Sequence, residues 1–139
     1  MAIKQYSLAR DGSTRLSPNL RVREFACPGS DTILIDEELV IALQCIREHF
    51  GKAVHITSGY RTAAHNAAVG GAKTSQHLQG RAADFWVEDT PVSTVAAYAE
   101  SLLPHHGGVG RYPKDKQHPT RKTGWVHIDT RAAKSRWVG

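Results

Sequence analysis

The sequence predicts a small α+β domain, in which a small antiparallel sheet is flanked by helices. Two observations support this class. The chain has 139 residues, of which 40% are hydrophobic, and this length fits one domain with one modest core. Helical patterns alternate with short strands and hairpins along the chain. We therefore expect a single domain over residues 1–139.

The N-terminal part contains the first clear helix. Residues 1–20 are polar and weakly patterned, which indicates a surface arm or a short first strand. Asp36 is a good N-cap, and Gly51 is a typical helix stop. Between them, one apolar face at helical spacing is formed by Leu39, Leu43, Ile46 and Phe50. A short strand at 53–57 should follow.

The middle of the chain carries a helix, a loop and a strand in close succession. Ser58–Thr62 is typical of a corner from strand to helix, and a short helix should run from about Thr62 to Val69 before two glycines. Residues 72–80 are predicted to be a loop, and 82–87 a strand. The loop and this strand hold the densest group of polar residues in the sequence.

The C-terminal part begins with a second amphipathic helix. Thr90-Pro91 is a clean helix start, with threonine at the N-cap and proline at the first helical position. Pro104 should end this helix. Strands are predicted at 107–112 and 125–129, joined by a basic loop, and the tail 130–139 is expected to pack on the surface.

Composition and charge exclude several classes of protein. No stretch approaches the roughly 20 apolar residues of a membrane span. Cys27 and Cys45 form no C-x-x-C pair, which argues against a disulfide scaffold and a cysteine-rich zinc site. The net charge of +5 suits nucleic acid and anionic wall polymers equally well. No nucleic-acid motif accompanies the basic cluster Lys114–Lys122, so we expect no specific nucleic-acid partner.

The first ten residues bear on location. Residues 1–10 lack the apolar core of a signal peptide, which predicts synthesis in a cytoplasm without a signal peptide. We expect no membrane partner and a monomeric chain.

Three residues have the chemistry of a catalytic zinc site. Such a site takes three protein ligands and leaves a fourth position for water. Imidazole and carboxylate both suit zinc, and His77, Asp84 and His127 make such a set. Gly80 lets the chain turn tightly between the first two.

The strand at 125–129 adds two neighbours to this set. Residues two apart on a strand share a face, so His127 and Asp129 should point the same way, and Trp125 could wall the pocket. By spacing alone a structural interpretation is equally good: His77 would be a loop histidine, Asp84 a capped carboxylate and His127 a core histidine.

Ordered sequence blocks extend the pattern beyond single residues. They are 56–62 (ITSGYRT), 65–72 (HNAAVGGA), 75–84 (SQHLQGRAAD), 107–112 (GGVGRY) and 126–131 (VHIDTR). Together these blocks resemble the zinc D-alanyl-D-alanine carboxypeptidase and L-alanyl-D-glutamate endopeptidase family, which shares its fold with the hedgehog signalling domain. The chain looks most like the small phage-type and bacterial single-domain members. The resemblance runs from about Phe25 to Arg131.

The resemblance implies a function and a set of site residues. It makes His77, Asp84 and His127 the ligands of Zn²⁺. It implies that Arg61 and Ser75 hold the substrate's carboxylate or its developing oxyanion; an arginine can grip a carboxylate with two parallel hydrogen bonds. The protein would be a zinc-dependent peptidase that hydrolyses peptidoglycan stem peptides, either at the terminal D-Ala-D-Ala bond or at an internal L-Ala-D-Glu-type bond. The protein would act at the bacterial cell wall after release, or as part of a phage particle.

One position departs from the family pattern. Studied members carry a carboxylate, the general base, three residues before the second zinc histidine, and this chain has Gly124 there. Asp129 is our first candidate for the base. Equally, it is a structural carboxylate that orients His127 or pairs with Arg131. The alternative function is a catalytically weak or inactive zinc-containing module that binds the cell wall.

Overall fold

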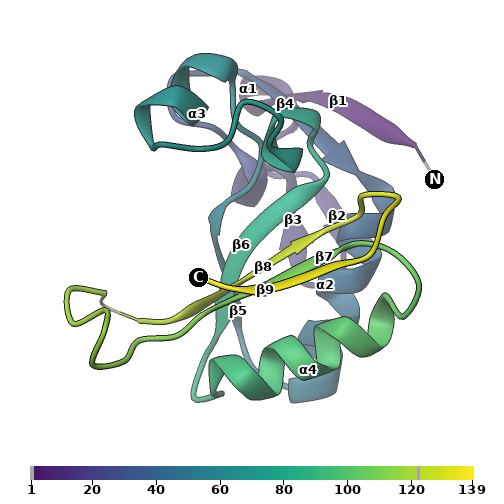
Figure 1. Cartoon of the computed structure of the whole chain (residues 1–139). Coiled ribbons are helices and arrows are strands. Elements are labelled where there is room, and N and C mark those ends of the chain that lie inside the picture. Colours follow the sequence, from purple (N-terminus) through teal and green to yellow (C-terminus); the bar gives the residue numbers. More distant parts are fainter. Residues whose placement is uncertain (1, 122) are drawn as a thin grey trace.

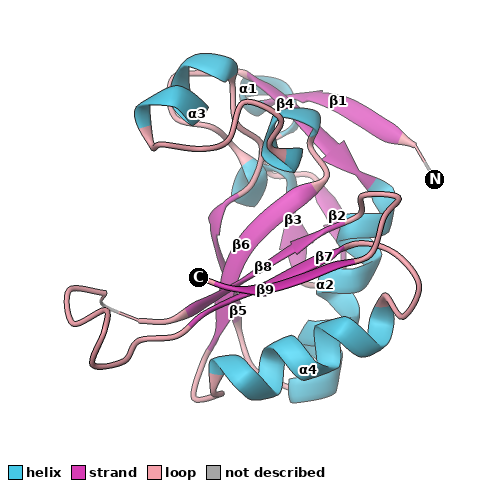
Figure 2. Cartoon of the chain, viewed as in Figure 1, coloured by secondary structure: helices cyan, strands magenta, loops and turns pink. Residues whose placement is uncertain are grey.

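The structure is a computed structural model that describes residues 2–121 and 123–139. Met1 and Lys122, the last residue of the basic cluster, lie outside the described residues. The largest sheet has five strands in the order β5-β6-β8-β7-β9, and Figure 2 shows it between helical segments. Its strands are β5 (Val54–Ser58), β6 (Ala82–Val87), β7 (Gly108–Tyr112), β8 (Trp125–Asp129) and β9 (Ser135–Val138).

Smaller elements surround this sheet. The short strands are β1 (Ile3–Ser7), β2 (Arg15–Ser17), β3 (Leu20–Arg21) and β4 (Thr32–Asp36), paired as β1-β4 and β2-β3. The α-helices are α1 (Leu8–Asp11), α2 (Glu37–Phe50), α3 (Ala63–Ala68) and α4 (Val92–Leu102), and the 3-10 helices are η1 (Val22–Phe25) and η2 (Gln76–Gln79). The predicted α+β class, with a small largely antiparallel sheet and flanking helices, is confirmed.

The five-stranded sheet has two faces of different character. Its core face packs against α2 and α4 (Figure 1). The fully buried apolar side chains of this face alternate along three strands and include Ala83, Phe85, Val109, Val126 and Ile128. The residues between them point to the opposite face, because successive side chains of a strand alternate. That second face is available to build a site.

The first long helix follows the sequence prediction closely. The Asp36 carboxylate accepts a hydrogen bond from the Glu38 N–H, and α2 ends at Gly51, whose φ of 63° is left-handed. Glycine carries no steric penalty in that conformation. Likewise the Thr62 hydroxyl caps α3 by accepting from the His65 N–H.

The structure decides one prediction that was left open and corrects three others. Of the two alternatives for residues 1–20, the short first strand is present, because β1 pairs along its whole length with β4. The loop at 72–80 contains η2. The N-cap of α4 is Pro91, without a side-chain cap, while the Thr90 hydroxyl donates to the Glu88 carbonyl. The tail forms β9, which runs parallel to β7.

The helices bear on whether the chain could cross a membrane. Within residues 2–121 and 123–139, none has both the length and the apolar character that crossing a membrane requires.

Candidate metal centre

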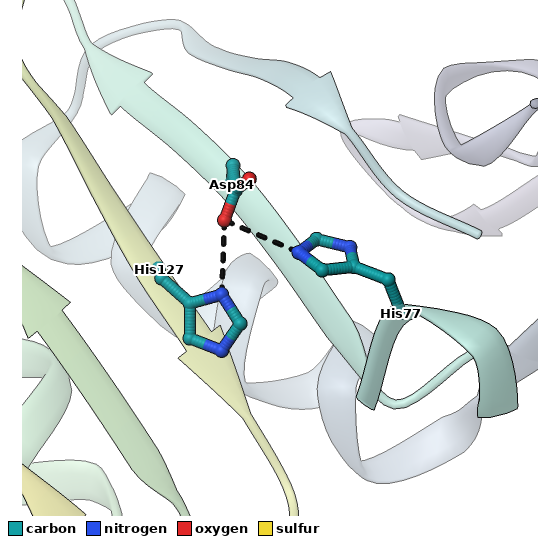
Figure 3. A group of neighbouring side chains, drawn as sticks. All are labelled: His77, Asp84 and His127. Carbon is teal, nitrogen blue, oxygen red and sulfur yellow. Dashed lines mark hydrogen bonds and ion pairs between the residues drawn. The ribbon is translucent and has the colours of Figure 1, made fainter. Parts of the chain in front are cut away.

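Three side chains from separate elements converge on the second face of the sheet. His77 comes from η2, Asp84 from β6 and His127 from β8. Figure 3 shows both imidazole rings turned toward one carboxylate oxygen of Asp84. One ligand atom from each residue lies within 4.8 Å of the others. The three residues predicted from the sequence are therefore brought together.

His77 is held by the backbone around it. Its Nδ1 lies 2.7 Å from the Gly59 carbonyl oxygen, and because a carbonyl only accepts, Nδ1 carries the proton. Its Nε2 faces Asp84 Oδ1, 3.3 Å away. Gly80 ends η2 at a φ of 73°, and a Cβ there would lie 2.3 Å from the Leu34 carbonyl oxygen. The turn thus requires glycine at position 80, both for its left-handed φ and for the close approach of the Leu34 backbone.

His127 is placed by the register of the sheet. Asp84 on β6 lies directly opposite His127 on β8, and His127 Nδ1 is 2.9 Å from Asp84 Oδ1. On its other side, His127 Nε2 lies 2.7 Å from Asp129 Oδ2. A carboxylate behind a metal-binding histidine fixes the ring orientation and tautomer. The predicted shared face of His127 and Asp129 is present.

Asp129 is completely buried, and its oxygens are fully engaged. It accepts from the Gly108 N–H at 2.9 Å and the Arg131 N–H at 3.1 Å. The Arg131 guanidinium adds contacts of 2.8 Å to Oδ1 and 2.6 Å to Oδ2. Gly108 is essential to this arrangement, since a Cβ there would lie 2.4 Å from the Asp129 carboxylate. Both structural partners that the sequence suggested for Asp129, His127 and Arg131, contact it.

Arg61 holds the far oxygen of Asp84. Its Nη2 is 3.2 Å from Asp84 Oδ2, its Nε donates to the Ser58 hydroxyl at 2.9 Å, and its Nη1 donates to Asn66 Oδ1 at 3.3 Å. Only 14% of its side chain is exposed. Each guanidinium nitrogen therefore already has a protein partner.

The charges at the site shift three pKa values. Burial alone would raise the pKa of Asp84, but hydrogen bonds from His127 and His77 outweigh it and lower that pKa well below its usual range. For Asp129, burial is likewise outweighed by hydrogen bonds from His127 and Arg131, which lower its pKa. Burial lowers the pKa of His127, but the two carboxylates beside it raise it overall. Both carboxylates are therefore ionised at neutral pH.

This donor set fits a divalent cation. His127 has a carboxylate against each ring nitrogen, so in the metal-free protein a proton lies between Nδ1 and Asp84. A metal ion can take the place of that proton, because Nδ1 of His127, Nε2 of His77 and Oδ1 of Asp84 converge. Two imidazole nitrogens and one carboxylate oxygen are ligands that zinc accepts, with a fourth position left for water.

The three side chains His77, Asp84 and His127 line a cleft of about 470 Å³. Ser75 and Trp125 line it. The Ser75 hydroxyl accepts from the His77 N–H and so caps η2. Trp125 stacks on Tyr112 with ring centroids 4.9 Å apart. The cleft thus has a polar wall from the Ser75 segment and an aromatic wall from β7 and β8.

Trp137 is a cleft residue that the sequence pattern did not predict. It lies on β9 with its ring centroid 5.1 Å from that of His127, and its Nε1–H donates to the Tyr112 hydroxyl at 2.8 Å. Gly110 makes room for it, since a Cβ there would lie 2.6 Å from the indole. The third glycine of the 107–112 block, Gly110, was the available signal, because a strand position without a side chain allows close packing.

Gly124 leaves no room for a carboxylate. A Cβ at this position would lie 2.6 Å from Val92 Cγ2 and 2.9 Å from the Tyr112 carbonyl oxygen. Among the described residues that line the cleft, Asp84 is the sole acidic one. The packing around position 124 therefore accommodates glycine and excludes the carboxylate that the family pattern has there.

Fold and site together define a class: an α+β protein with a two-histidine, one-carboxylate group in an open cleft, the arrangement of a metallohydrolase. Comparison with known families makes this specific. The peptidase M15 family matches residues 18–129, and the chain belongs to that family. The match includes all three residues of the candidate metal centre.

Curated relatives agree with this membership. Over 91 residues, the chain is 35% identical to the probable peptidoglycan L,D-endopeptidase MepK of Haemophilus influenzae, covering 62% of this chain and 43% of the relative. It is 36% identical over 88 residues to peptidoglycan L,D-endopeptidase MepK of Escherichia coli K12, covering 60% of this chain and 43% of the relative. The alignments thus span less than half the length of either relative.

Proposed function

We propose that this protein is a zinc-dependent peptidase that hydrolyses peptide bonds in peptidoglycan stem peptides. The observation that carries the proposal is the convergence of His77, Asp84 and His127 in an open cleft. Membership of the peptidase M15 family supports the reaction class. The names of the two relatives support peptidoglycan as the substrate, and favour endopeptidase over D-Ala-D-Ala carboxypeptidase activity.

The three residues would hold Zn²⁺, which when bound lowers the pKa of a bound water toward about 7 and polarises a carbonyl. That property allows hydrolysis at neutral pH without a carboxylate at position 124. His77 would bind through Nε2 and His127 through Nδ1, because their other nitrogens already donate to Gly59 and Asp129. The substrate would lie in the cleft between Ser75 and Trp125.

The geometry changes the roles that we propose for Asp129 and Arg61. Asp129 is buried, and each of its oxygens accepts several hydrogen bonds. It therefore suits the orientation of the metal ligand His127 better than the abstraction of a proton. Arg61 acts through Asp84, fixing which oxygen faces the metal. Arg61 can still assist an oxyanion with its remaining N–H groups, but its main contacts are with the protein.

The test is digestion of purified peptidoglycan by the zinc-loaded protein, with the released fragments identified by mass spectrometry. We expect stem-peptide fragments whose ends identify the bond cut. His77→Ala should abolish their release. Glu100→Gln is the matched control, because Glu100 pairs with Arg111 and does not line the cleft. No fragment release by fully zinc-loaded protein would refute the proposal.

A second candidate is a zinc-containing module that binds the cell wall without cutting it. The observation that favours it is Gly124, where packing excludes the family's carboxylate. Cosedimentation with intact peptidoglycan, without fragment release, would support this candidate. Fragment release would exclude it.

A further inference from the structure

Arg131 is a second arginine, besides Arg61, in the cleft that holds His77, Asp84 and His127. It follows β8 directly and lines the cleft together with His127 and Trp137. Its side chain is 32% exposed, compared with 14% for Arg61. The two arginines therefore differ in how much of the guanidinium a ligand can reach.

Two neighbours hold the Arg131 guanidinium in place. Its Nε and Nη2 donate to the Asp129 carboxylate, at 2.8 Å to Oδ1 and 2.6 Å to Oδ2. Its carbon centre lies 5.3 Å from the centroid of the Trp137 ring, within the range of a cation–π contact. The group is thus oriented before any ligand arrives, which reduces the entropy cost of binding.

One nitrogen remains open. In the described part of the chain, no protein acceptor lies within hydrogen-bonding distance of Arg131 Nη1, whereas all three guanidinium nitrogens of Arg61 have protein partners. An arginine whose Nη1 is free, beside a metal group, suits a carboxylate ligand, because hydrogen bonds between ions are stronger than those between neutral groups. Stem peptides carry free carboxylates, whereas an amidated peptide offers none at the same position.

We propose that Arg131, oriented by Asp129 and Trp137, binds a free carboxylate of the peptide substrate close to the scissile bond and so selects acidic over amidated peptides. The inference rests on the proposed function, since it names the substrate feature that this same cleft recognises. It assigns to Arg131 the substrate contact that the sequence suggested for Arg61.

The experiment combines a change in the protein with a change in the substrate. Two synthetic stem peptides are compared that differ only in whether the carboxyl group beside the scissile bond is free or amidated. The proteins are zinc-loaded wild type, Arg131→Gln, Arg131→Lys and Arg111→Gln. Arg111 is the matched control: it is 31% exposed and paired with a carboxylate, that of Glu100, but lies outside the cleft.

Wild type should cut the acid with a kcat/KM about ten- to a hundredfold above that for the amide, the range expected for a hydrogen bond to a charged group. Arg131→Gln should remove this preference by lowering kcat/KM for the acid alone, and Arg131→Lys should restore part of it. Arg111→Gln should keep it. Equal losses on both peptides would mean that Arg131 only positions Asp129, and would overturn the inference.

Binding separates this inference from the proposed function. If wild type cuts neither peptide, the proposed function fails, and the same pair is compared by calorimetric affinity for the zinc-loaded protein. Tighter binding of the acid that is lost in Arg131→Gln would still support the carboxylate site. Equal affinities for acid and amide would overturn it.

Discussion

Asp129→Asn separates the two roles considered for this carboxylate. Asparagine keeps the shape of the side chain but replaces one acceptor oxygen with an NH₂ donor. Either orientation of the amide sets that donor against existing donors: the backbone N–H groups of Gly108 and Arg131 on one side, or His127 Nε2 and Arg131 Nη2 on the other. The least costly response is for His127 Nε2 to give up its proton and accept from the amide, which leaves the remaining ring proton on Nδ1.

This change of tautomer disables a metal ligand. With a proton on Nδ1, His127 no longer offers a lone pair toward Asp84, and the cation loses one of three protein ligands. Loss of such a supporting carboxylate typically weakens metal binding by about 10- to 100-fold, which corresponds to about 1.4–2.8 kcal/mol. We therefore expect the zinc dissociation constant of Asp129→Asn to rise by that factor.

The assay is competition for zinc against a chromophoric chelator, with kcat measured at saturating zinc. Glu100→Gln is the control, because it removes a carboxylate that contacts arginines away from the cleft, and its zinc affinity should match wild type. If Asp129→Asn binds zinc as tightly as wild type yet loses kcat by orders of magnitude, Asp129 is the general base and our reasoning is wrong.

Other changes test the packing and the charges of the site. Gly110→Ala should destabilise the fold by about 1–3 kcal/mol, as for an overpacked core, and urea unfolding with unchanged stability would refute the close packing of Trp137 on β7. Asp36→Ala removes the α2 cap and a buried hydrogen bond from Thr130, so it should cost at least about 1 kcal/mol; an unchanged melting temperature would contradict this. Without zinc, the raised pKa of His127 stabilises the fold fully below its usual pKa of about 6.5, and this contribution is lost as the pH rises through the folded-state value. With zinc bound, stability should instead rise with pH, because the metal displaces that proton. Melting curves with the same pH trend with and without zinc would refute the claim that the metal and the proton occupy the same position between His127 and Asp84.

The sequence predicted those parts of the fold that depend on local patterns. Asp36 and Gly51 bound α2 because capping and left-handed turns are set by a few neighbouring residues. His127 and Asp129 share a face because side chains alternate along any strand. The ordered blocks then indicated which histidines and which aspartate come together. Each of these inferences needs only nearby residues or a known family pattern.

Features that depend on distant pairing were beyond this reasoning. Strand β9 pairs with β7 in parallel, and nothing within 130–139 specifies that partner, so Trp137 was not predicted at the cleft. The pairing of β1 with β4 joins segments about 30 residues apart. Alternation predicted the direction of Asp129, but its complete burial arises from Gly108 on β7 and the fold-back of Arg131.

The most direct test of the central claim is the X-ray absorption spectrum of the zinc-loaded protein at the zinc edge. Two histidines and one carboxylate with a water predict two imidazole nitrogens and oxygen ligands at about 2.0–2.2 Å, with no sulfur. His127→Ala should lose one imidazole from that shell. A sulfur shell at about 2.3 Å, or a wild-type spectrum unchanged by His127→Ala, would contradict the assignment of His77, Asp84 and His127 as the metal centre.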